Sequence, residues 1–189
     1  MKEILGVAAV AFEIASIAIY YRSIFHRETK PHLYTHLVWA IVAFVVFAGQ
    51  FVSGAGPGSW AIGISAFFLL GTVTLSVKFG TTDITRSDTF ALCAALFTIV
   101  PWILTNNPLW SVVLATLIDA WAILPTFRKT WNDPYSESLS SWVIAEGKLA
   151  CAFAALSTYS LTTWFYPVEA FSMNAALITL MFIRRRKRI

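Results

Sequence analysis

Seven apolar segments of 14 to 25 residues alternate with short polar stretches along the chain. The stretches between them hold Gly, Pro, Asn or charged residues, as at 53–58, 106–108 and Tyr166-Pro167, which are typical of turns. No segment shows the period-2 alternation of a membrane β-barrel, so each is expected to be a helix. The pattern predicts helices at approximately 4–21, 33–52, 60–77, 89–104, 109–126, 141–165 and 170–183.

Composition places these helices in a membrane. Of the 189 residues, 58% are hydrophobic and only 13% are charged, with a mean hydropathy of +0.69. A soluble domain carries about 25% charged residues, so this chain has too little polar surface to cover a water-soluble globule. A soluble enzyme and a large extramembrane domain are excluded. The fold class expected is an all-α membrane protein with seven transmembrane helices in a single transmembrane domain, 1–189.

The basic residues predict the orientation. Twelve of the fourteen Lys and Arg residues lie in the first, third and fifth connections and at the C-terminus, whereas the opposite side carries only Lys2. Because cytoplasmic loops are rich in Lys and Arg, the N-terminus is expected outside and the C-terminus in the cytoplasm of a plasma or bacterial inner membrane. The positive charge therefore indicates contact with the lipid bilayer and not with nucleic acid. The basic cluster 184–188 is either a stop-transfer anchor or a contact for anionic lipid.

Two stretches of the sequence are related by a constant offset. Pro31 and Trp39 correspond to Pro134 and Trp142, in each case 103 residues apart. This indicates parallel repeats at 1–78 and 108–184, a connector helix at 88–105 and a basic tail at 185–189. In transporters with parallel repeats the substrate site lies at the repeat interface.

In this plan the chain resembles the SWEET and PQ-loop superfamily, a resemblance that also rests on Leu124-Pro125-Thr126 near the inner end of the fifth segment. Thr126 stands where that family has Gln, and Tyr21-Arg22-Ser23 in the first repeat has no proline. The resemblance, which extends to permeases of the PnuC type, implies passage of a small neutral or zwitterionic solute, passive or proton-linked. Such proteins often form homo-oligomers, but no motif here decides the oligomeric state.

Charged residues inside a bilayer are costly and indicate functional sites. Asp119 and Lys148 lie at similar depth on small-residue faces of their segments, so they are expected to form an ion pair. That pair would either lock the second repeat or act as a gate or ligand clamp. Glu13 has no basic partner in its own repeat and is expected to stay protonated, as a proton-coupled site or as a tolerated buried acid. Glu146 is expected to reach water.

Polar and aromatic side chains complete the candidate site. Ser16 and Tyr20 share the side of the first segment that carries Glu13. Asn174 resembles the central asparagine of the superfamily's seventh helix, and its amide offers donors and acceptors to a solute or to another helix. The substrate-binding candidates are therefore Asn174, Asp119, Lys148, Glu13 and Ser16.

The gate or hinge candidates are Pro125, Trp39, Trp142 and Tyr20. Trp39 and Trp142 lie too near the inner boundary to stack on a sugar, which favours an anchor or an inner gate. Pro125 is either a hinge or a helix end. The three histidines, His26, His32 and His36, are expected to be solvated at the inner face.

The function expected is alternating-access transport of a small polar solute. A receptor or assembly factor that binds without transport on the same fold remains an alternative. A retinal protein is a weaker one, because Lys148 lies on the sixth and not the seventh segment. No Ser/His/Asp grouping, metal-ligand cluster or phosphate loop is recognised, so no enzyme activity, metal or cofactor is expected.

Overall fold

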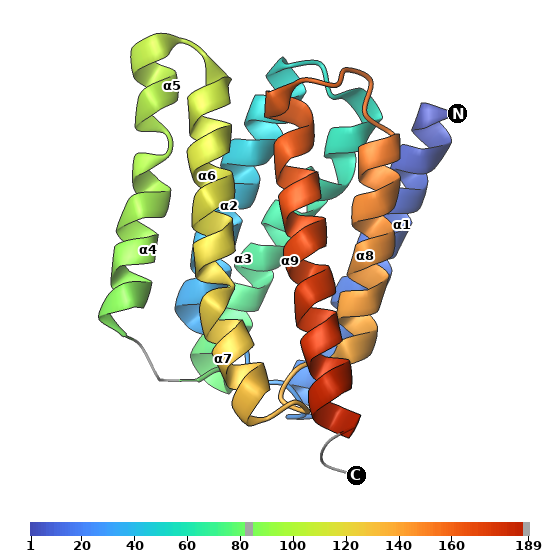
Figure 1. Ribbon diagram of the computed structural model, residues 1–189, viewed down its shortest axis with the longest axis vertical. Coiled ribbons are helices and arrows are strands. Elements are labelled where there is room, and N and C mark those ends of the chain that lie inside the picture. Colours follow the sequence, from blue (N-terminus) through green and yellow to red (C-terminus); the bar gives the residue numbers. More distant parts are fainter. Residues whose placement is uncertain (82–84, 187–189) are drawn as a thin grey trace.

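The computed structural model of the chain describes residues 1–81 and 85–186. These residues form nine α-helices and one 3-10 turn, with no strand, in a bundle that has the N-terminus at one end and the C-terminus at the other (Figure 1). The last three residues of the predicted basic tail, 187–189, lie outside the described residues. The helices are α1 (Lys2–Phe25), α2 (Leu33–Val52), α3 (Trp60–Phe79), α4 (Arg86–Phe97), α5 (Val100–Thr105), α6 (Pro108–Ala122), α7 (Leu124–Asn132), α8 (Leu139–Ala154) and α9 (Leu161–Arg186), with the 3-10 turn η1 at Gly56–Ser59.

The helices have the length and surface of membrane spans. Six helical stretches are long and apolar enough to cross a bilayer, with α4 and α5 counted as one stretch and α6 and α7 as another. The remaining long helix, α8, has 16 residues. Large apolar side chains such as Phe67, Phe97 and Leu104 are exposed on the outside of the bundle, where lipid would cover them. The described chain is thus all-helical and has the helices of a multi-pass membrane protein.

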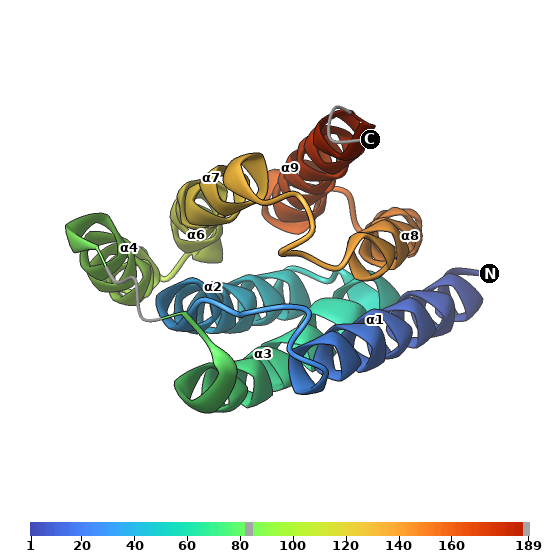
Figure 2. The ribbon, with the colours of Figure 1, turned by 90° about the horizontal axis from the view of Figure 1, so that it is seen from below.

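Two layers of helices face each other across the bundle (Figure 2). In one layer α3 packs against both α1 and α2, and in the other α9 packs against both α6 and α8. The layers meet where α1 packs on α8 and α2 packs on α6. Helix α4 lies at the edge, beside α2 and α6. The largest apolar core surrounds α2, where Val38, Val42 and Val46 are almost fully buried.

The predicted boundary between the sixth and seventh helices is wrong. Tyr166-Pro167 lies inside α9, and the true connection is residues 155–160, which end in Ser157-Thr158-Tyr159-Ser160. These short polar side chains hold the turn through local hydrogen bonds, as where Thr163 Oγ1 donates to the Thr158 carbonyl. Pro167 is tolerated within α9, as proline often is in membrane helices, because neighbouring groups satisfy the freed carbonyl. The correction places Glu169 within a membrane-spanning helix.

Two other predicted helices are interrupted close to a proline. The fourth divides into α4 and α5 at Thr98-Ile99, just before Pro101, and the fifth divides into α6 and α7 at Ile123, just before Pro125. Proline lacks the N–H that a continuous helix needs, which explains both positions. Pro125 therefore begins a new helix and does not end one, since α7 continues to Asn132.

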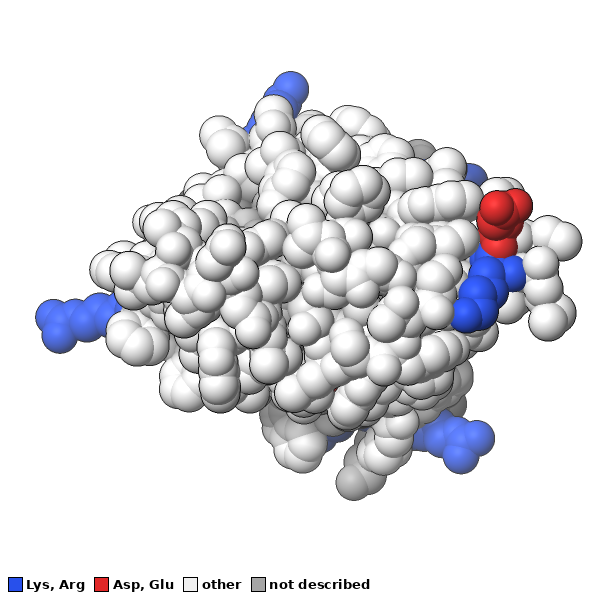
Figure 3. All heavy atoms as spheres, turned by 90° about the horizontal axis from the view of Figure 1, so that it is seen from above, with Lys and Arg blue, Asp and Glu red and all other residues white. Residues whose placement is uncertain are grey.

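Charge is distributed unequally between the two ends of the bundle. Ten of the twelve Lys and Arg residues in the described part belong to the end where α1, α3, α7 and α9 finish, the exceptions being Lys2 and Lys148. Figure 3 shows the opposite end, whose centre carries almost no charged side chain. Such an asymmetry is what membrane orientation rules act on.

Candidate functional site

A cavity of about 140 Å³ lies in the middle of the bundle, between the two layers. Side chains from six helices (α1, α2, α3, α6, α8 and α9) line it. It brings together every candidate site residue from the sequence except Pro125, which lines a separate cavity nearer the basic end. The sequence candidates on its walls are Glu13, Ser16, Tyr20, Trp39, Asp119, Trp142, Lys148 and Asn174.

Lys148 makes its ion pair with Glu13, across the interface between α1 and α8. The Lys148 Nζ atom lies 2.9 Å from Glu13 Oε2, and both side chains are largely buried. The Ser65 hydroxyl of α3 donates to the other carboxylate oxygen, Oε1, and lies 3.4 Å from Lys148 Nζ. Glu13 is therefore not unpaired, as the lack of a basic residue in its own repeat had suggested. Its partner, Lys148, comes from the other layer.

Asp119 and Asn174 contribute unpaired polar groups to the cavity. Asp119 is 8% exposed and, among the described residues, forms no ion pair within 4.0 Å, so the predicted Asp119–Lys148 pair is not formed. The amide of Asn174 likewise makes no hydrogen bond within the described part of the chain. Asp119 is buried, Asn174 is half-buried and both line the cavity, so these two groups are available to a bound solute.

Ser16 has partners of its own. Its hydroxyl donates to the Ser141 carbonyl at 2.9 Å, and the Ser141 hydroxyl donates back to the Ser16 carbonyl at the same distance. These reciprocal bonds hold α1 close to α8 just beside the Glu13–Lys148 pair. The structure therefore gives Ser16 a contact between helices, although it also borders the cavity.

Four ring side chains separate this cavity from a vestibule of about 560 Å³ at the basic end. Tyr20, His36, Trp39 and Trp142 line both spaces and so lie between them. The ring centres of Trp39 and Trp142 are 6.2 Å apart in an edge-to-face arrangement, and His36 packs edge-on against Trp39 at 5.3 Å. We call these four residues the ring layer. The Trp39 indole N–H in this layer has no partner in the described structure.

His36 belongs to the ring layer and is not a solvated surface residue. It is only 6% exposed, which corrects the expectation for this histidine. Its Nδ1 atom lies 2.9 Å from the His32 carbonyl and its Nε2 atom lies 3.3 Å from the Tyr20 hydroxyl. A carbonyl only accepts, so Nδ1 carries the hydrogen, and in the neutral ring Nε2 accepts from Tyr20.

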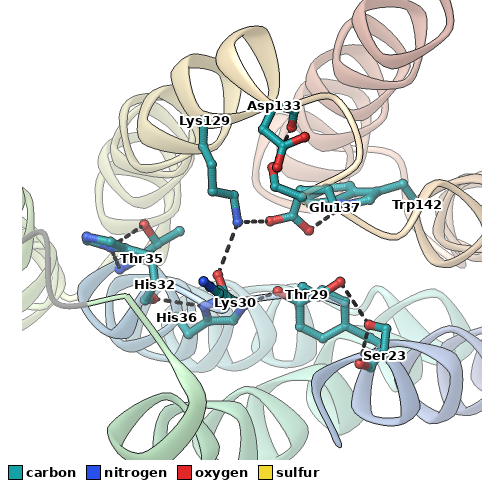
Figure 4. Close-up of polar contacts among 12 residues, drawn as sticks. Ser23, Thr29, Lys30, His32, Thr35, His36, Lys129, Asp133, Glu137 and Trp142 are labelled. Carbon is teal, nitrogen blue, oxygen red and sulfur yellow. Dashed lines mark hydrogen bonds and ion pairs between the residues drawn. The ribbon is translucent and has the colours of Figure 1, made fainter. Parts of the chain in front are cut away.

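A buried carboxylate supports the ring layer from the vestibule side (Figure 4). Glu137 is 4% exposed, lies 2.5 Å from Lys129 Nζ, and accepts a hydrogen bond from the Trp142 indole at 3.3 Å. Lys129 also donates to the Lys30 carbonyl at 3.1 Å. Lys129 thus joins the connection after α1 to the connection after α7, which belong to different layers.

Toward the opposite end of the bundle the helices are closely packed. Gly49 of α2 lies against Val112 of α6, and a side chain at this position would collide with it. Nearby, the Gln50 amide donates to the Thr163 carbonyl of α9 at 2.8 Å. These contacts join the two layers on this side of the cavity.

Sequence reasoning missed three buried groups. His36 was expected to be solvated at the inner face. Glu137 was not considered, although an acid five residues before Trp142 in a basic connection was a usable signal. Glu169 was hidden by the misplaced turn at Tyr166-Pro167. Both its oxygens are buried without a partner in the described structure, as are those of Glu146, which was expected to reach water.

The arrangement is suited to binding a polar solute. One ammonium group, two carboxylates, an amide and an indole N–H converge on this small cavity. In the described residues, no three His, Cys, Asp or Glu side chains are grouped so that they could hold a metal ion. No protein-family model, curated protein or solved structure matches the chain.

Proposed function

We propose that the protein is a seven-helix, two-repeat transporter that moves a small polar solute by alternating access, on the plan of the SWEET and PQ-loop superfamily. The observation that carries the proposal is the central cavity. Charged and polar groups at mid-bilayer depth are costly unless they serve a site, and here they are gathered in one place. The cavity is bounded by a packed end and by a ring layer, which are the two barriers that alternating access requires.

The helix boundaries support the two repeats. Adding 103 to the ends of α2 gives 136–155, close to Leu139–Ala154 of α8, and adding it to α3 gives 163–182, close to Leu161–Arg186 of α9. The third helix of each repeat also packs against both of its companions. Trp39 and Trp142, which the offset relates, contact each other. Equivalent residues meet in this way at an axis between two repeats.

The charge asymmetry supports the orientation. With the basic end in the cytoplasm, the vestibule and Lys129 face the cell interior and the packed end faces outward. For seven spans, α8 must cross the membrane with 16 residues, which is short but extended by the connections at each end. The solute would then enter or leave on the cytoplasmic side through the ring layer.

The test is solute flux into liposomes that contain the purified protein. A thermal-shift screen of sugars, amino acids, nucleosides, vitamin precursors and organic acids first finds a stabilising solute. Exchange of that radiolabelled solute is then measured for the parent and for Asp119→Asn and Asn174→Ala. Both variants are expected to lose most of the exchange, because each changes a polar group of the cavity wall that has no hydrogen-bond partner among the described residues.

A matched control is Ser172→Ala on the same helix as Asn174. Ser172 is exposed and its hydroxyl donates to the Val168 carbonyl of its own helix, so exchange should be unchanged. Binding without exchange would overturn transport and favour a receptor. Exchange that survives both cavity variants would overturn the assignment of the site.

A further inference from the structure

A second cavity, of about 560 Å³, lies at the edge of the bundle between α2, α4 and the start of α7. It shares no lining residue with the central cavity, but it adjoins the vestibule, whose lining also includes Asp88, Pro125 and Arg128. We call this second cavity the α4 groove. Its polar lining includes Arg86, Thr85 and Ser87 at the start of α4 and Arg128 of α7, and its apolar lining includes Val38, Ala91, Trp121 and Leu124.

Within the described residues, the two arginines of the α4 groove carry positive charge that no acid pairs. Arg86 and Arg128 are exposed, and neither has a hydrogen-bond or ion-pair partner among the described residues. Asp88, the acid that the described residues contribute to the lining, is already occupied. Its carboxylate accepts from the Thr85 N–H at 2.7 Å and from the Thr85 hydroxyl at 2.8 Å, and it lies 3.7 Å from His32 Nε2.

Exposed apolar side chains lie on the same two helices as the walls of the groove. The Trp121 indole N–H donates to the Ser87 hydroxyl at 3.3 Å and so joins α6 to α4. Further along these two helices Phe90 and Phe97 of α4 and Leu117 of α6 are exposed to the outside. A ligand with a charged head and apolar chains would match both the groove and this surface.

We propose that the α4 groove binds the phosphate headgroup of an anionic phospholipid, with Arg86 and Arg128 as its ligands. A guanidinium group forms paired hydrogen bonds to phosphate, and basic pockets between membrane helices are known to bind lipid headgroups. The acyl chains would lie along the exposed apolar side chains of α4 and α6. A free phosphate ion would use the arginines but would gain nothing from this apolar surface.

The experiment measures lipid binding to the delipidated full-length chain by native mass spectrometry. The parent is titrated with phosphatidylglycerol, with phosphatidylcholine and with inorganic phosphate. The double variant Arg86→Gln/Arg128→Gln is expected to bind phosphatidylglycerol about thirtyfold more weakly. This factor corresponds to the loss of two contributions of about 1 kcal/mol each to the binding free energy. Arg86→Lys/Arg128→Lys keeps the charge and reports on folding. Its affinity for phosphatidylglycerol should lie between those of the parent and the Gln double variant, because lysine cannot form the paired bonds.

A control variant removes the same charge at the same end of the bundle. Arg22→Gln/Lys78→Gln changes two residues at the ends of α1 and α3, away from the groove, and should bind phosphatidylglycerol as the parent does. An equal loss in this control would overturn the assignment, since only the general charge would matter. Equal binding of phosphatidylcholine, or competition by inorganic phosphate at the same concentration as the lipid, would overturn it as well.

Discussion

The Glu13–Lys148 pair shows how much a single buried charge depends on its partner. Taking either ion out of water costs several kcal/mol, which the other ion and the Ser65 hydroxyl offset. The pair also joins α1 to α8, at the interface between the two layers. The stability of the bundle should therefore respond to the balance of these two charges more than to either residue alone.

We expect Lys148→Met to lower the free energy of unfolding by about 3–5 kcal/mol, because it leaves the Glu13 carboxylate buried without a counter-charge. The double variant Glu13→Gln/Lys148→Met removes both charges and should recover most of that loss. Thermal unfolding of the purified protein in detergent measures both. Lys78→Met, at the exposed end of α3, is the control for loss of a lysine. If the losses of unfolding free energy in Lys148→Met and in Glu13→Gln simply add in the double variant, the pair does not contribute as a unit.

At the scale of elements, the connection that carries Glu137 contacts the ring layer. Glu137 holds the Trp142 indole on one side and Lys129 on the other, and Lys129 reaches the Lys30 carbonyl of the other layer. No part of this set lies in the solute cavity except Trp142. Glu137 is thus a positioning residue whose effect would be on access and not on binding.

We expect Glu137→Ala to expose the central cavity to the vestibule side on the order of tenfold more often, since a hydrogen bond to a charged group contributes about 1.5–3 kcal/mol. Ser65→Cys in a chain with Cys93→Ala and Cys151→Ala reports on this, through its rate of alkylation by a water-soluble maleimide. Glu137→Gln keeps an acceptor for Trp142, so its rate of alkylation should lie between those of the parent and Glu137→Ala. Unchanged alkylation in Glu137→Ala would show that the ring layer does not depend on Glu137.

The candidate site was more accessible to sequence reasoning than the pairing within it. Charged residues stand out in apolar segments, so Glu13, Asp119 and Lys148 could be assigned to one site. Their pairing depends on which layer faces which, and that information is spread over the whole bundle. The turn at Tyr166-Pro167 was misplaced for a related reason. Proline marks a turn in soluble proteins, but in membrane helices neighbours can satisfy the freed carbonyl.

For the whole molecule, the two proposed repeats explain why the site lies where it does. Equivalent residues of two parallel repeats meet only near their common axis, and the Trp39–Trp142 contact marks that place. The cavity lies directly beside this contact and is lined from both layers. Its chemistry is nevertheless unsymmetrical, because Glu13 corresponds to Thr116 and Lys148 to Val45 under the same offset of 103. A bound solute would therefore have a fixed orientation.

The orientation of the molecule decides on which side each barrier opens, and it can be measured directly. Thr158 lies in the connection before α9 and Ser140 at the start of α8, at opposite ends of the bundle, and both are exposed (Figure 1). In a chain with Cys93→Ala and Cys151→Ala, we expect a membrane-impermeant maleimide to label Thr158→Cys in intact cells and Ser140→Cys only after permeabilisation. The reason is that ten of the twelve described basic residues lie at the Ser140 end.

The reverse pattern would place the ring layer and the vestibule outside the cell, and it would move the α4 groove to the outer leaflet. Labelling of both positions in intact cells would instead show two orientations in the same membrane. The end with Lys2 carries little charge, so the ten basic residues at the other end should set one orientation. A mixed population would mean that these residues do not act as an orientation signal. Thr158→Ser and Ser140→Thr, which add no thiol, are the controls for background labelling. The expected single pattern would fix the ring layer as the cytoplasmic barrier.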